Sequence, residues 1–312
     1  MGDKIRKMIG LLKYSKTGSL FAVLAIYVLL ILSNIINTYL LNGSDNFIIV
    51  FLIFSMVIPA LFWFFIKENK CYIPSLRLNA PKKEHILPIL LSFTLLLSGS
   101  IILNMIFSGE NYINFSIYNA FYAERDQGFF NILYTALVFA ILPAILEEFI
   151  FRGILCAEFE GNGTLCAVVA SSLFFSFLDF SFGSLPIRFF AGIVLAVILY
   201  ATDSLICSML LHIAYNLFAL FAQPIFVSFK DVSANVELFV FILLVVVIVS
   251  LILLVSQLSR LYRIYSQKNV SSDYTKSIPI QKMPIAFAEI LLSVPAICCY
   301  VVFLITSIIL LI

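Results

Sequence analysis

The sequence predicts an all-α protein built as a polytopic bundle of about nine transmembrane helices, and three observations support this. Hydrophobic residues make up 62% of the 312 residues, and charged residues only 12%. The mean hydropathy of +1.11 is higher than a soluble domain of this size sustains. The apolar residues are gathered in runs long enough to cross the bilayer core, which takes about 20 helical residues. These features leave no room for a separate soluble domain.

Nine apolar runs follow one another along the chain. The sixth and seventh are short, so we expect these two to be tilted or partly re-entrant if they do not cross fully. The runs lie at about residues 20–41, 47–66, 86–107, 129–150, 165–182, 187–201, 204–223, 237–254 and 285–312.

The positively charged residues predict the orientation. Three clusters, before the first run, between the second and third, and between the eighth and ninth, hold most of the 19 Lys and Arg residues. With nine spans these clusters share one face of the membrane, whereas Arg125, Arg188 and Lys230 lie on the other. By the positive-inside rule the N-terminus is cytoplasmic and the C-terminus lies outside the cell membrane. The net charge of only +2 argues against a nucleic-acid surface and leaves membrane lipid as the expected partner.

Two longer connecting segments divide the chain into three parts. Residues 1–128 hold the first three runs and end in segment 108–128, whose Tyr and Phe residues at three- and four-residue spacing predict an amphipathic helix at the membrane interface. Residues 129–222 hold the polar motifs described below. Residues 223–312 hold the last runs and a basic connector at 257–284, predicted to be cytoplasmic. The six cysteines lack metal-ligand spacing and are interpreted as packing residues.

The stretch from Glu147 to Gly153 places three charges within an apolar region. A carboxylate inside a membrane helix costs ~2.5–3.5 kcal/mol on insertion scales, so such residues are rare unless they bind, catalyse or hold helices together. Glu148 and Arg152 are four residues apart and are predicted to form a structural ion pair on one helical face. Glu147 is rotated by ~100° around the helix and has no local partner. This favours Glu147 as a catalytic carboxylate, just after Pro143, where the helix is expected to kink.

Further polar residues occur at membrane depth in later runs. Asp179 lies near the end of the fifth run, and His212 and Asn216 are four residues apart in the seventh. Taken singly, each has a structural explanation: a carboxylate at the interface, a hydrogen-bonded core histidine and an amide that joins two helices. Taken with Glu147, they predict one wet cavity with side chains within ~10 Å of one another. Such a cavity holds the acid, base and amide groups needed to hydrolyse an amide bond.

These motifs resemble those of the CAAX protease and bacteriocin-processing family, over roughly residues 129–222. The first motif, Glu-Glu-x-x-x-Arg followed by glycine, and the third, His-x-x-x-Asn, are complete. The second, Phe-x-x-x-His, keeps Phe175 but has Asp179 in the histidine position. Gly192 matches the glycine that usually lies between the second and third motifs. The candidate catalytic set comprises, in chain order, Glu147, Glu148, Arg152, Asp179, His212 and Asn216.

The resemblance implies an intramembrane endopeptidase that cleaves a membrane-associated protein or peptide, with a site near the cytoplasmic half. It implies that Glu147 activates water with the help of Asp179, while His212 and Asn216 stabilise the tetrahedral oxyanion. A divalent metal such as zinc, held by Glu147, Asp179 and His212, is left open as a cofactor. Without a metal, two neighbouring carboxylates would instead share one proton.

Two other interpretations are kept beside the protease. Asp179 in place of histidine is compatible with a non-catalytic relative that acts in bacteriocin self-immunity or as a membrane scaffold. An ion-coupled transporter that uses Glu147 and Asp179 belongs to a different class. The chain shows no internal repeat or inverted hydropathy symmetry, which disfavours transport.

Overall fold

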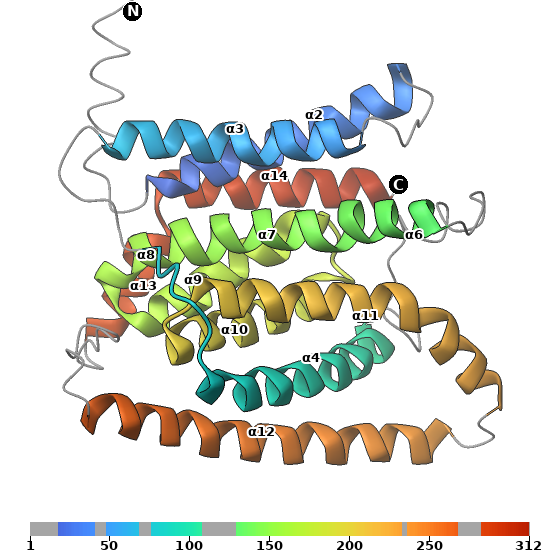
Figure 1. Cartoon of the computed structure of the whole chain (residues 1–312). Coiled ribbons are helices and arrows are strands. Elements are labelled where there is room, and N and C mark those ends of the chain that lie inside the picture. Colours follow the sequence, from blue (N-terminus) through green and yellow to red (C-terminus); the bar gives the residue numbers. More distant parts are fainter. Residues whose placement is uncertain are drawn as a thin grey trace, which may run out of the picture. The chain divides into compact units, whose positions relative to one another are not determined.

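The computed structural model describes residues 18–40, 48–68, 76–107, 129–232, 236–267 and 282–311. Within these ranges every regular element is a helix (Figure 1), which confirms the all-α class. The chain divides into two compact units, each made of separate stretches of sequence. Unit 1 comprises residues 1–76, 149–180 and 275–312, and unit 2 comprises residues 77–148 and 181–274. The three-part division expected from the sequence follows the motifs and stays a prediction.

The described part of each of the nine predicted runs is mostly helical, with non-helical residues at 180–182, 204 and 292–293. By length and composition, five helices in the described ranges qualify as membrane spans. A sixth is added if α13 (Met283–Leu291) and α14 (Val294–Leu311), which meet at 61°, form one broken span. Three further apolar helices are shorter. The protein is therefore a polytopic helical membrane protein, and nine crossings stay a prediction.

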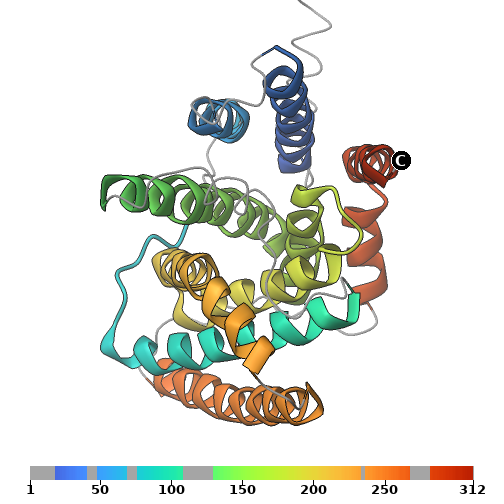
Figure 2. The same ribbon diagram turned by 90° about the vertical axis from the view of Figure 1, so that its right-hand side faces the viewer.

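Unit 2 is built around helix α4 (Ile86–Phe107), which contacts α10 (Leu185–Thr202), α11 (Leu205–Val232) and α12 (Val236–Gln267). Figures 1 and 2 show α12 running alongside α4. Gly99 permits a close approach of α4 to α10, because a Cβ atom there would lie 2.5 Å from the ring of Phe190. α11 packs in turn against the helix that carries the glutamates.

An ion pair and hydrogen bonds join the turn between α10 and α11 to the segment that precedes α4. Arg77 Nε lies 2.8 Å from Asp203 Oδ1, and Asn79 Nδ2 donates to Asp203 Oδ2 at 2.8 Å. Asp203 ends α10 in the left-handed region with φ of 49°, a conformation that Asp tolerates better than most residues. Ser204 Oγ donates to the carbonyl of Asn79 at 2.5 Å. These bonds fix the position at which α11 begins. The start of a helix sets its rotation, and therefore determines which side chains of α11 face α7.

Unit 1 contains α2 (Ser19–Leu40), which contacts both α3 (Ile48–Glu68) and α14. The first turn of α2 is capped by a residue far away in the sequence: the carboxylate of Glu158 accepts a hydrogen bond from the backbone N–H of Ser19 at 2.7 Å. A carboxylate at this end of a helix satisfies unpaired donors and complements the helix dipole. A cluster of aromatic rings joins α9 (Thr164–Ser176) and η6 (Phe177–Asp179) to α14; its members are Phe174, Phe177, Tyr300 and Phe303.

The predicted connector begins inside a helix. The sequence places its start at residue 257, and α12 continues to Gln267 over 32 residues, about 48 Å at ~1.5 Å per residue. The reason is that the apolar stripe persists beyond the eighth run: Leu254 and Leu261 are both buried on one helical face. Residues 268–281 of the connector, the aromatic segment 108–128 and the basic N-terminal cluster lie outside the described residues.

Candidate active site

Glu147 and Glu148 are the last two residues of α7 (Leu142–Glu148), which lies between two π-helical stretches. The first, η3, spans Ala136–Ile141, and the second, η4, spans Phe149–Leu155. Pro143 lacks an N–H, so it cannot bond the carbonyl four residues before it and favours a local irregularity. π-Helical turns are rare and occur frequently at functional sites. The irregular helix therefore marks the place where the two carboxylates lie.

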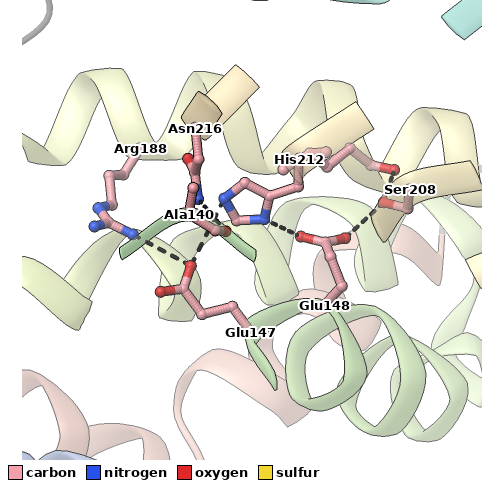
Figure 3. A network of polar contacts seen from close by, with 8 residues as sticks. Ala140, Glu147, Glu148, Arg188, Ser208, His212 and Asn216 are labelled. Atoms are coloured by element: carbon pink, nitrogen blue, oxygen red, sulfur yellow. Dashed lines mark hydrogen bonds and ion pairs between the residues drawn. The ribbon is translucent and has the colours of Figure 1, made fainter. Parts of the chain in front are cut away.

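Helix α11 presents three polar side chains on one face toward these carboxylates. Ser208, His212 and Asn216 follow one another at four-residue spacing, and Figure 3 shows them along the same side of the helix. Ser208 was not singled out from the sequence, although its spacing to His212 carried the signal. Hydroxyl, imidazole and amide groups are thus aligned along the helix that packs on α7.

Glu148 joins Ser208 to His212. Its side chain is fully buried. Ser208 Oγ donates to Glu148 Oε2 at 2.5 Å, and Glu148 Oε1 lies 2.9 Å from His212 Nδ1 (Figure 3). An ionised Glu148 only accepts hydrogen bonds, so we assign the hydrogen of this pair to Nδ1, which donates the hydrogen bond to Glu148. This fixes the imidazole ring and directs Nε2 toward Glu147.

Glu147 is not unpaired, which corrects the expectation from the sequence. Its Oε2 atom lies 3.4 Å from Arg188 NH1 on α10 and 3.8 Å from His212 Nε2. Side-chain exposure is 9% for Glu147 and 27% for Arg188. The helical spacing around Glu147 contained no cation, so the partner was missed because it comes from a distant part of the sequence. One carboxylate oxygen thus faces both a guanidinium and an imidazole.

The contact between Glu147 and Arg188 bears on the predicted topology. Glu147 lies near the middle of the continuous 34-residue helix Phe129–Asn162. Arg188 lies in the first turn of α10. Their charged groups lie 3.4 Å apart, so the positive charge of Arg188 is part of the polar cluster. The assignment of Arg188 to the outer face of the membrane stays a prediction.

Asn216 lies on the same face of α11 as His212 and is mostly buried. Its Nδ2 atom donates to the carbonyl of Ala140 in η3 at 3.4 Å, a long and therefore weak hydrogen bond. In the view of Figure 3 the amide is drawn between the imidazole of His212 and the side chain of Arg188. Unit 2 thus brings together four of the six candidate residues: Glu147, Glu148, His212 and Asn216.

The other two candidates belong to unit 1. The guanidinium of Arg152 is buried and lies 4.2 Å from the centre of the Phe175 ring. Phe175 is the phenylalanine of the second motif. Asp179 ends η6 and is exposed, and the next residue, Phe180, has a positive φ of 49°. The pairing of Arg152 with Glu148 and the approach of Asp179 to Glu147 stay predictions.

The sequence leaves zinc open as a cofactor, and a catalytic zinc takes three protein ligands. Unit 2 offers Glu147 Oε2 and His212 Nε2, 3.8 Å apart, and it places the guanidinium of Arg188 on the same oxygen. A fixed positive charge there opposes a bound cation. Across the described ranges, no group of three or more His, Cys, Asp or Glu residues is placed to hold a metal. The donors of unit 2 do not by themselves form a zinc site.

Comparison with known proteins points to one family. Residues 129–218 match the family model described as "Type II CAAX prenyl endopeptidase Rce1-like". No curated protein and no solved structure matches the chain. The matched segment contains both glutamates, Arg188, Ser208, His212 and Asn216. The match supports the assignment of this segment to a CAAX protease family, and the apolar helices make the chain a multi-pass membrane protein.

Proposed function

We propose that this protein is an intramembrane endopeptidase in which Glu147 activates water to hydrolyse a peptide bond. The observation that supports this most is the placement of Glu147 Oε2 at 3.8 Å from His212 Nε2, with the imidazole held by Glu148 at 2.9 Å on its other nitrogen. A base, an orienting carboxylate and hydrogen-bond donors then surround a single point, as general base catalysis requires.

The proposed reaction needs only groups of this chain. Glu147 takes a proton from water as the water oxygen attacks the carbonyl carbon of the scissile bond. The resulting oxyanion is stabilised by His212 and Asn216, and donors of this kind are each worth ~10²–10³ in kcat. When the C–N bond breaks, Glu147 returns the proton to the leaving nitrogen, so the base is regenerated.

The contacts of His212 support its role beside the oxyanion. Glu148 Oε1 holds the ring at Nδ1, at 2.9 Å. Nε2 lies 3.8 Å from Glu147 Oε2, so the ring faces the point where the water attacks and the oxyanion would form.

The substrate is proposed to be a membrane-associated protein or peptide. The matched family is described as a prenyl endopeptidase, so a farnesylated peptide ending in a CAAX sequence is the first probe to use. A second candidate is a non-catalytic relative that acts in bacteriocin self-immunity or as a scaffold. It is favoured by one observation, Asp179 in the position of the histidine of the second motif.

The test is cleavage of this probe by the full chain, purified in lipid nanodiscs. Glu147→Gln removes the base and keeps the shape, so we expect cleavage to be abolished. Glu237→Gln is the matched control, because Glu237 is exposed in the first turn of α12 and far along the chain from the motifs; its rate should stay at the wild-type value. Equal cleavage by Glu147→Gln and wild type would contradict the proposal. A wild-type protein that cleaves nothing would favour the non-catalytic relative.

A further inference from the structure

The inference concerns Arg188, a residue outside the three family motifs. We propose that Arg188 is a positioning residue that holds the carboxylate of Glu147 toward His212 and places a positive charge beside it. This inference rests on the proposed function, since it assigns Arg188 a part in the same reaction. It adds a fourth element, the first turn of α10, to a site otherwise built from α7, η3 and α11.

The charges around Glu147 show why a cation is needed there. Among the described residues of unit 2, the charged or titratable groups that face Glu147 are Glu148 from its own helix, His212 from α11 and Arg188 from α10. Glu148 carries the same charge as Glu147 and follows it directly in the sequence. Two neighbouring negative charges repel each other, whereas the positive charge of a neighbouring guanidinium attracts both. Arg188 is the member of this set whose charge does not depend on pH.

The geometry of the pair suits a base better than a structural lock. Arg188 NH1 lies 3.4 Å from Glu147 Oε2, which is longer than the ~2.7–2.9 Å of a tight charge-assisted hydrogen bond. The same oxygen faces His212 Nε2. A loose contact keeps the negative charge on Glu147 without withdrawing the lone pair that must accept a proton from water.

A structural ion pair in the same unit provides a comparison. Arg77 lies 2.8 Å from Asp203, whose other oxygen accepts from Asn79, and the Arg77 guanidinium lies 4.8 Å from the centre of the Tyr200 ring. This pair fastens a turn, and its side chains are 11% and 18% exposed. The pair of Arg188 is longer by 0.6 Å (3.4 Å less 2.8 Å) and its arginine is more exposed, at 27%. The two arginines are thus held in different ways.

The start of α10 explains how Arg188 is placed. Ser184 precedes the helix, and Pro186 occupies its first turn, where a missing N–H has no cost. The backbone N–H of Arg188 donates to the carbonyl of Ser184 at 2.9 Å. The Cα position of Arg188 is therefore fixed by the helix start, and the long side chain reaches from there to Glu147.

Two substitutions separate charge from shape in the cleavage assay. Arg188→Gln should lower kcat by about 10- to 100-fold, a part of the ~10²–10⁴ that a positioned base contributes, while KM changes by less than about threefold. Arg188→Lys keeps the charge and should recover part of the lost kcat. Added guanidinium ion should also raise the cleavage rate of Arg188→Gln, because it replaces the missing group. A structural defect elsewhere in the protein would not be rescued in this way. Arg260→Gln, at an exposed position on α12, is the matched control and should leave kcat unchanged.

A second measurement needs no substrate. Thermal unfolding of wild type, Arg188→Gln, Glu147→Gln and the double variant forms a cycle that isolates the coupling between the two side chains. Arg188→Gln should lower the Tm in the presence of Glu147 and have little effect once Glu147 is Gln. Additive shifts would overturn the pairing.

The outcomes distinguish the inference from the function on which it rests. If Glu147→Gln keeps its activity, the proposed function fails, and the unfolding cycle alone decides the pairing. If Glu147→Gln is inactive but Arg188→Gln has wild-type kcat, the inference fails and the protease proposal stands. A rise in KM at constant kcat would also overturn the inference, because it would make Arg188 a substrate-binding residue.

Discussion

Replacing Ser208 by alanine tests whether the buried chain from Ser208 through Glu148 to His212 holds the site together. The substitution removes the donor that lies 2.5 Å from Glu148 Oε2 and leaves a fully buried carboxylate with one hydrogen bond fewer. A hydrogen bond to a charged group contributes about 1.5–3 kcal/mol. At about 2–4 °C per kcal/mol, the expected loss in Tm is roughly 3–12 °C. Because His212 is held through Glu148, kcat should fall as well, by about 10- to 100-fold.

The assay is thermal unfolding in nanodiscs, followed by probe cleavage below the transition. Ser250→Ala is the matched control, since Ser250 is also buried in unit 2 but donates to the carbonyl of Val247 within its own helix, at 3.1 Å. A hydroxyl that bonds within its own helix contributes little, so its Tm should change by less than about 1 °C. If Ser208→Ala and Ser250→Ala lowered the Tm equally, the bond to Glu148 would not be a stabilising one. An unchanged kcat in Ser208→Ala would show that His212 is oriented without Glu148.

Three further expectations concern activity and topology. His212→Ala should lower kcat by about 10²–10³ if it supplies oxyanion stabilisation, and single-turnover rates measure this. Asp179→His restores the family pattern and should preserve or raise the cleavage rate. Cleavage seen only with this change would show that the natural chain has lost protease activity. Tags at the N-terminus and in segment 268–281 should be protected in intact cells while a C-terminal tag is accessible, as the basic clusters predict for the cell membrane. Tags at the N-terminus and in that segment found on opposite faces would disprove the count of nine spans.

The helices could be predicted from the sequence because their signal is local. A run of about 20 apolar residues has few other ways to exist in a bilayer, where each backbone polar group must bond within its own helix. The ends were less predictable. α12 extends past Leu254 because its apolar stripe continues on one face, while the polar composition after residue 256 suggested a connector. Membrane crossing depends on depth as well as length, which is why the number of crossings stays a prediction.

The site was predictable where its geometry follows from helical spacing. His212 and Asn216 are four residues apart and therefore lie on one face of α11. Ser208 lies four residues before His212, on the same face. The contact of Arg188 with Glu147 depends on the packing of α10, which no local spacing encodes. Arg188 was therefore counted as a loop charge. The i, i+4 rule predicts Arg152 as a partner of Glu148, and this stays a prediction. The bonds of Glu148 to Ser208 and His212 come from another helix, so no local spacing encodes them.

The most direct test of water activation by Glu147 is a single turnover of the farnesylated probe in water enriched with heavy oxygen. If Glu147 acts as a general base, the new carboxylate of the product takes its oxygen from the solvent, and Glu147 itself stays unlabelled. Mass spectrometry of the product and of the peptide that contains Glu147 measures both. Heavy oxygen in the product alone is the predicted result. Ordinary oxygen in the product with heavy oxygen on Glu147 would show a covalent acyl intermediate and contradict the proposed role of the carboxylate.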